Sequence, residues 1–244
     1  MSAPADGHFP PTSWTLIGRI KSADATVAEA ALEQLCAQYH YPLYCYLRRR
    51  GCDHQDAQDV LQDFLARLCR VRAFERLDEA LGRLRGYLAT GLSRHLALWR
   101  RGESRHQPIA PELDQLVDFD TSADRYERER FADHDTPDRV FERKWAIELL
   151  CQVIDQLAAR YRERGRSAVF NVLRPVLESG GSLRGEDAPA LAAQLGVSEE
   201  ALRAQLARLL REFRAVMHIA VRQTVEHEGE VDAEMRHLMG LFGR

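Results

Sequence analysis

Three carboxylates share one face of a predicted helix in the amino-terminal half of the chain. Asp56, Asp59 and Asp63 are spaced i, i+3 and i+7, while Val60 and Phe64 lie on the opposite side. Such a face could bind a divalent metal, as in helical prenyl-transforming enzymes, could be simply solvated, or could meet a basic protein partner. The sequence has no second carboxylate motif at matching spacing, no phosphate-cradling glycine loop and no Ser-His or Cys-His signature. We therefore predict a protein that is not an enzyme and that uses no metal and no cofactor.

Arginine residues gather in one short segment. Residues 82–106 contain six Arg and a single acid, whereas residues 110–138 contain ten acids and three Arg. The formal net charge of −3 therefore hides a basic block followed directly by an acidic one. Arg side chains in such a block suit the phosphates of a nucleic acid. The six are Arg83, Arg85, Arg94, Arg100, Arg101 and Arg105.

The composition is that of an ordinary globular protein. Of 244 residues, 45% are hydrophobic and 29% charged, which allows one large domain or two small ones. No apolar run approaches the roughly 20 residues that span a bilayer. Residues 1–12 are rich in Pro and Ala and lack a signal-peptide pattern, so we expect a short disordered lead-in and a cytoplasmic protein.

The cysteine pattern favours buried free thiols. Five cysteines are present, an odd number, and no pair has CxxC spacing. A zinc site formed with His40 or His54 is the weaker alternative, because Cys commonly packs as a small hydrophobic residue. The cysteines are Cys36, Cys45, Cys52, Cys69 and Cys151.

Apolar residues recur at helical spacing along nearly the whole chain. Strand signals are almost absent, so we predict an all-α fold of two small helical domains, residues 13–106 and 138–225, joined by an acidic flexible linker, 107–137. A tail, 226–244, follows, with an amphipathic pattern at 231–242 that suits packing on the carboxy-terminal domain or binding of a regulator. The predicted helices are 27–39, 41–51, 55–68, 84–99, 140–162 and 167–177, and another begins at Asp187. Pro42 would lie in the first turn of the helix 41–51, where proline is tolerated.

Residues 187–214 have the spacing of a helix-turn-helix. Asp187 can cap a short helix, Gly196 provides the turn, and Ser198 can cap a second helix. A small residue at Ala192 and an apolar one at Leu202 suit two helices that cross closely. The alternative is an ordinary helical hairpin with a solvated polar face. The caps, the glycine and the inner residues all favour the helix-turn-helix.

In a helix-turn-helix the start of the second helix enters the major groove of DNA. Glu199 and Glu200 lie there and lower the intrinsic affinity for phosphates, so we expect the module to need help from a partner. The candidate DNA-binding residues are Ser198, Glu200, Arg203, Gln205, Arg208 and Arg211.

The order of these motifs resembles the sigma factors of bacterial RNA polymerase. YCYLRRRG (44–51) followed by DAQDVLQDFLARL (56–68) resembles their polymerase-binding helices, and GRLRGYL (82–88) running into SRHLALWRR (93–101) resembles their promoter-melting helix. The carboxy-terminal motif resembles their second DNA-reading domain. TSWTLI (12–17) and TPDRVFERKWA (136–146) are similar to one branch of the extracytoplasmic-function group. The resemblance covers residues 12–225.

The resemblance implies roles for the two charged segments. The acidic helix would bind the clamp coiled coil of the largest polymerase subunit, and the Arg-rich helix would bind the upstream (−10) promoter element and hold its opened strand. Polymerase-binding candidates are Asp56, Asp59, Gln62, Asp63 and Arg67. DNA-melting candidates are Arg83, Arg85, Arg94, His95, Trp99, Arg100, Arg101 and Arg105. Because few acids are near in sequence, we expect Arg94, Arg100, Arg101 and Arg105 to face solvent.

The resemblance also suggests a role for the acidic linker, and the chain differs from the family at a few positions. In the family the tether runs through the channel that later holds RNA, so its carboxylates could stand in for RNA phosphates, or could simply keep the linker solvated. His95 stands where many relatives have Asn, and Gln205 and Leu210 where relatives often have Arg, so the resemblance leaves the promoter sequence open. The linker carboxylates are Glu112, Asp114, Asp118, Asp120 and Asp124.

The function expected from the sequence is that of a sigma factor. Its partners would be core RNA polymerase and promoter DNA, with the −35 element read by the helix-turn-helix; an anti-sigma factor or other regulator is left open, and no small-molecule substrate or membrane insertion is expected. The alternative is a helix-turn-helix transcriptional regulator that does not bind polymerase. Only the sigma factor needs residues 56–68 and 83–105. A helical metalloenzyme built on the three carboxylates is the third reading.

Overall fold

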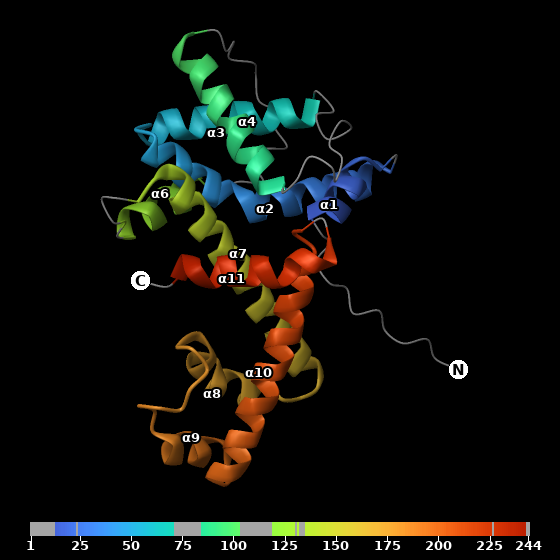
Figure 1. Ribbon diagram of the computed structural model, residues 1–244, viewed down its shortest axis with the longest axis vertical. Coiled ribbons are helices and arrows are strands. Elements are labelled where there is room, and N and C mark those ends of the chain that lie inside the picture. Colours follow the sequence, from blue (N-terminus) through green and yellow to red (C-terminus); the bar gives the residue numbers. More distant parts are fainter. Residues whose placement is uncertain are drawn as a thin grey trace. The chain divides into compact units, whose positions relative to one another are not determined.

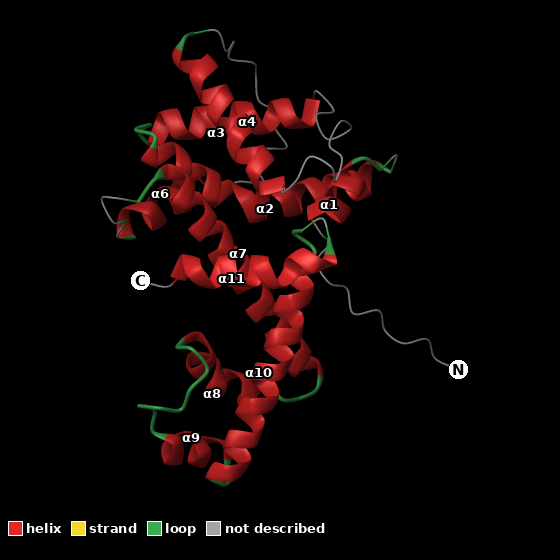
Figure 2. Ribbon diagram, in the orientation of Figure 1, coloured by secondary structure: helices red, strands yellow, loops and turns green. Residues whose placement is uncertain are grey.

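The computed structural model describes residues 13–22, 24–70, 84–102, 119–129, 131, 135–225 and 227–242, without the side chains of 13–15, 69–70 and 119–120. Within these ranges every regular element is a helix (Figure 2), so the predicted all-α class is confirmed. None of the described helices combines the length and the apolar character needed to cross a membrane.

The chain forms two compact units. One contains everything up to Glu148 together with Val221–Arg244, and the other is Leu149–Ala220. Both unit boundaries fall inside long helices, α7 (Pro137–Glu163) and α10 (Glu199–Arg222). The division therefore differs from the predicted domains 13–106 and 138–225, because the start of α7 and the carboxy-terminal tail belong to the first unit.

The first unit is built on a long helix. α2 (Ala25–Arg49) packs against α1 (Ser13–Ile20), and Asp24 caps it by accepting hydrogen bonds from the N–H groups of Thr26 (2.9 Å) and Val27 (3.3 Å). The break predicted before Pro42 is absent: α2 runs through it without interruption, with Pro42 buried. Burial of residues 41–47 on every side of the helix stabilises this segment and outweighs the backbone hydrogen bond that proline cannot make.

The next two helices pack on each other and α3 also packs on α2. Asp53 caps α3 (His54–Arg70), as predicted, by accepting a 2.8 Å hydrogen bond from the N–H of Asp56. α4 (Leu84–Arg100) contains Gly91, where an added Cβ would lie 3.3 Å from the ring of Phe64. This close approach accounts for a glycine inside a helix.

The predicted flexible linker contains a folded segment. α6 (Phe119–Arg128) packs on α2, and Tyr126 stacks on Phe131 with ring centroids 4.7 Å apart. The guanidinium of Arg48 on α2 lies 4.6 Å from the Tyr126 ring. Residues 107–118 of the predicted linker, including Glu112, Asp114 and Asp118, lie outside the described residues.

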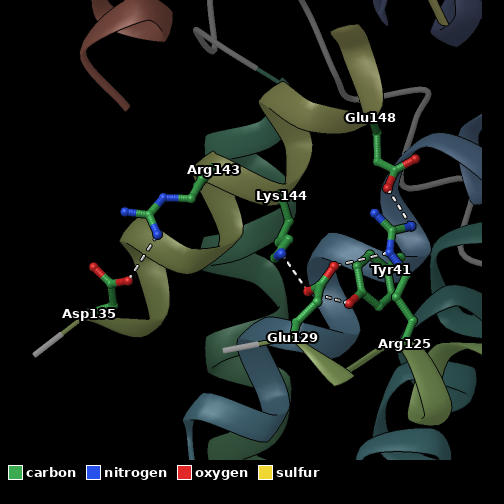
Figure 3. Close-up of polar contacts among 7 residues, drawn as sticks. All are labelled: Tyr41, Arg125, Glu129, Asp135, Arg143, Lys144 and Glu148. Atoms are coloured by element: carbon green, nitrogen blue, oxygen red, sulfur yellow. Dashed lines mark hydrogen bonds and ion pairs between the residues drawn. The ribbon is translucent and has the colours of Figure 1, made fainter. Parts of the chain in front are cut away.

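Polar contacts also hold this segment to the first turns of α7 (Figure 3). Glu129 accepts a 2.7 Å hydrogen bond from the Tyr41 hydroxyl and an ion pair from Lys144. Arg125 pairs with Glu129 at 3.3 Å and with Glu148 at 2.8 Å, and Arg143 reaches Asp135 at 3.2 Å. Residues 121–129 and Asp135 are therefore held to the rest of the first unit by ion pairs and hydrogen bonds.

The second unit has its own hydrophobic core. It comprises the end of α7, α8 (Ser167–Glu178), α9 (Ala188–Leu195) and most of α10, which Figure 1 traces from gold to orange. Tyr161 and Phe170 pack with ring centroids 5.6 Å apart. The buried cluster is completed by residues such as Val153, Leu157, Leu173, Ala192, Leu202, Leu206, Leu209 and Val216.

The chain ends in two short helices of the first unit. A 3-10 turn, η3 (Glu228–Glu230), leads into α11 (Val231–Phe242), whose bounds match the predicted amphipathic pattern. Val231, Leu238 and Leu241 are buried, whereas Met239 and Phe242 are exposed. The tail therefore has an apolar face that packs on the unit.

Candidate functional site

The turn between α9 and α10 has the predicted local geometry. Asp187 accepts a 3.0 Å hydrogen bond from the N–H of Ala190, and Ser198 accepts one of 3.2 Å from Ala201. Gly196 adopts φ 65° and ψ 33°, a left-handed conformation that favours glycine. The N–H of Val197 then reaches the carbonyl of Ala192 at 3.1 Å. These bonds end α9 at Gly196 and begin α10 directly after Ser198.

α10 presents a mixed charged face at its amino-terminal end. Arg203, Arg208 and Arg211 are exposed, as are Ser198 and Glu200, and buried leucines lie on the opposite side. Arg203 donates to Glu199 one turn earlier at 2.7 Å. Because this pair is exposed and screened by solvent, it costs little to open.

Gln205 differs from its predicted outward position. Its side chain is half-buried, and its Oε1 is buried without a hydrogen-bond partner in the described part of the chain. Leu210 is also half-buried and lies over Gly181, where an added Cβ would come within 2.6 Å of it. Leu210 is covered because the loop after α8, at Gly181, lies against this side of α10.

The end of α4 carries exposed arginines. The predicted exposure of Arg94, Arg100 and Arg101 is confirmed, whereas Arg83 and Arg105 lie outside the described residues. Arg100 donates a 2.6 Å hydrogen bond to the carbonyl of Arg50, just past the end of α2. Trp99, directly before Arg100, is half-buried.

Arg85 and His95 are buried, contrary to their predicted place on a DNA-binding surface. The guanidinium of Arg85 is 4% exposed, lies 2.6 Å from the Glu234 carboxylate of α11, and sits 4.5 Å from the Trp145 ring centroid. His95 Nε2 lies 3.0 Å from Oδ2 of Asp63. Partners distant in sequence, on α11, α7 and α3, cover these two side chains.

The acidic face of α3 is solvated only at its beginning. Asp56 and Asp59 are half-buried, and Oδ1 of Asp59 accepts a 3.1 Å hydrogen bond from Gln55. Arg67 is exposed, but Gln62 and Asp63 are buried within a continuous buried run, 60–66. The predicted polymerase-binding set is therefore split between surface and interior.

The carboxylates of α3 do not converge on a common point. Asp63 faces His95 while Asp59 bonds along its own helix to Gln55. Across the described ranges, no group of at least three His, Cys, Asp or Glu side chains is arranged to hold a metal ion. Cys36, Cys45 and Cys52 are buried free thiols and Cys151 is an exposed one; the side chain of Cys69 is outside the description. Burial raises the pKa of Cys45 to about 12, so this thiol stays protonated and unreactive.

Replacing Asp59 or Asp63 of α3 by Arg should have different effects on the stability of the fold. Asp63→Arg removes one member of a buried pair and buries a cation, so we expect it to lower the free energy of unfolding by about 3–5 kcal/mol. Asp59→Arg should change it by no more than about 0.5 kcal/mol. Urea denaturation of both variants measures this, with Asp155→Arg, an exposed acid of the second unit, as the control. Equal stability of Asp59→Arg and Asp63→Arg would contradict the assigned burial.

The buried His95 makes stability depend on pH. Burial is the largest influence and lowers the pKa of His95 below its ordinary value of 6.5, Asp63 opposes this, and Arg67 adds to it. The folded chain therefore binds fewer protons than the unfolded chain near pH 6. The free energy of unfolding keeps the whole contribution of His95 above about pH 6.5, and loses it as the pH falls through the lowered pKa of His95 in the folded chain. Thermal melts at pH 7.5 and 5.5 should show a larger loss for the wild type than for His95→Asn. An equal loss in the two chains would rule out His95 as the cause.

Sequence reasoning missed the residues that cover α4. Trp145 and Glu234 are far from Arg85 along the chain, yet they enclose it. Glu142 on α7 likewise lies 3.1 Å from His237 on α11. The available signal was Glu234 itself, a carboxylate placed on the apolar stripe of the tail helix between Val231 and Leu238.

The chain was compared with protein families, curated proteins and solved structures. No protein-family model, no curated protein and no solved structure matches the chain.

Proposed function

We propose that the protein is a sigma factor, a subunit that binds core RNA polymerase and directs it to promoter DNA. The observation that carries the proposal is that each compact unit presents exposed arginines along one helix: Arg94 and Arg100 on α4 with Arg101 directly after it, and Arg203 and Arg208 on α10. Two DNA-binding surfaces on one chain suit the reading of two separated promoter elements.

The two surfaces differ in a way that supports this division of work. α4 carries half-buried Trp99 beside its arginines, a combination suited to an unpaired strand. α10 enters from a tight turn with its first residues exposed, which suits the major groove of a duplex. The acids in the first turn of α10 weaken its hold on phosphate, which is consistent with a module that is delivered to DNA by a larger enzyme.

A helix-turn-helix regulator that never binds polymerase is the second candidate. The burial of Gln62 and Asp63 favours it, because a polymerase-binding helix needs an accessible face. Pull-down with bacterial core RNA polymerase, followed by transcription from a random promoter library, separates the two. A sigma factor is retained by core polymerase and enriches a common promoter sequence, and this retention is lost in Asp59→Arg but not in Asp155→Arg.

Removing one arginine from α10 should weaken promoter binding in a sequence-dependent way. Arg203→Ala should lower the affinity of the polymerase complex for a selected promoter by roughly 5- to 100-fold, as for loss of a base or phosphate contact. Fluorescence anisotropy across a salt series measures this. Arg174→Ala is a matched control, because Arg174 is also an exposed arginine in an i, i+4 pair, 2.8 Å from Glu178. Equal losses in the two variants would mean that α10 does not read the promoter.

A further inference from the structure

A buried ion pair ties the tail helix to the candidate DNA-binding helix. Arg85 of α4 and Glu234 of α11 approach to 2.6 Å, with side-chain exposures of 4% and 0%. Both belong to the first unit. Burying a guanidinium and a carboxylate costs hydration free energy that offsets much of the attraction between them. The pair is therefore weak evidence of a purely stabilising role.

The geometry at Arg85 resembles the binding of an anion. One carboxylate oxygen of Glu234 lies 2.6 Å from one guanidinium nitrogen of Arg85, and a phosphate oxygen can take the same place beside a guanidinium. Glu234 therefore occupies the position from which a phosphate would contact Arg85. The same helix carries the exposed Arg94 and Arg100, and the exposed Arg101 follows directly after it, so Arg85 is the covered one among the described arginines of residues 84–102.

Arg85 is covered by Glu234 of α11 and by the Trp145 ring of α7. It also lines a cavity of about 180 Å³ with residues of α4 and of the first turns of α7. α11 is held by the buried Val231, Leu238 and Leu241 and by the half-exposed contact of His237 with Glu142 at 3.1 Å. Displacement of this single short helix removes the Glu234 carboxylate from the guanidinium.

We propose that α11 is an autoinhibitory element, in which the Glu234 carboxylate takes the place of a nucleic-acid phosphate on Arg85. This inference rests on the proposed function of α4 as a DNA-binding helix. It predicts that the chain binds single-stranded DNA weakly while α11 is docked, and that undocking adds one cationic contact to the strand.

The test uses the full chain and a fluorescent 25-nucleotide oligo-dT strand. Leu238→Asp places a charge on the buried face of α11 and undocks it, which hydrogen exchange of residues 231–242 verifies. Met239→Asp is the matched control, since it adds the same charge to the same helix at a side chain that is 60% exposed. We expect Leu238→Asp to bind the strand about tenfold more tightly than Met239→Asp, and the slope of log K against log salt to steepen by about 0.7. Adding Arg85→Ala to Leu238→Asp should abolish the gain.

Equal affinity of an undocked Leu238→Asp and of Met239→Asp would overturn the inference. If Leu238→Asp unfolds the unit, Glu234→Gln decides, because it keeps the shape and removes only the charge; tighter strand binding than wild type supports autoinhibition, and unchanged binding refutes it. The proposed function is tested by a separate measurement: it fails if the wild-type chain does not bind core polymerase in the pull-down.

Discussion

The double variant Arg94→Ala/Arg101→Ala should bind core polymerase normally but fail to open promoter DNA. Both side chains are exposed and seven residues apart on the same side of α4, where they can contact one strand. Loss of two phosphate contacts to the opened strand should reduce open complexes by roughly 10- to 100-fold, at about 1 kcal/mol or more for each contact. A permanganate footprint on a selected promoter reports strand opening directly.

Stability measurements separate this effect from misfolding. Arg94 and Arg101 are both exposed, and Arg101 donates to the carbonyl of Ala97 one turn earlier at 3.2 Å, so we expect the double variant to change the free energy of unfolding by about 0.5 kcal/mol or less at each site. Arg100→Ala should cost more, about 1 kcal/mol, because it loses the bond to the Arg50 carbonyl. Arg19→Ala/Arg128→Ala, which removes the same charge elsewhere on the first unit, is the control. Normal strand opening by the α4 variant would place melting elsewhere in the chain.

Glu129→Ala should be among the most destabilising single changes in the first unit. Burial alone would raise the pKa of Glu129, but hydrogen bonds from Lys144 and Tyr41 and the charges of Lys144 and Arg125 outweigh it and lower the pKa. Truncation leaves Lys144, whose side chain is only 9% exposed, without this partner. We expect a loss of about 3 kcal/mol in the free energy of unfolding, measured by urea denaturation.

A neighbouring acid provides the matched control for Glu129. Glu127 lies two residues earlier, pairs with Arg48 at 2.8 Å and is 67% exposed, against 26% for Glu129. Glu127→Ala should therefore cost no more than about 1 kcal/mol. Replacing Glu129 and Lys144 together by Leu and Met should restore much of the stability lost in Glu129→Ala, because no unpaired charge remains. Similar losses in Glu127→Ala and Glu129→Ala would show that the network in Figure 3 does not hold the segment.

Local sequence patterns determined the helices and the α9–α10 turn. Capping by Asp53, Asp187 and Ser198 and the left-handed Gly196 depend on residues within one helical turn, so a pattern in the sequence is sufficient to predict them. The bounds of α11 follow from its apolar stripe for the same reason. Exposure of Arg94, Arg100 and Arg101 also followed from local charge, because only one acid, Glu103, is nearby in sequence to pair with them.

Tertiary structure decided which charged residues are accessible. Arg85 and Asp63 carry the same local signals as their more accessible neighbours, but they are buried against Glu234 and His95, which are 149 and 32 residues away in the sequence. Residues 119–129 look like a solvated linker in sequence, yet aromatic and ionic partners on α2 and α7 fold them onto the first unit. Burial is set by the whole set of neighbours in space, whereas periodicity and charge runs describe only neighbours along the chain. For this reason the sequence determined the type and position of the helices, and only the tertiary structure decided which of their faces remain open to a partner.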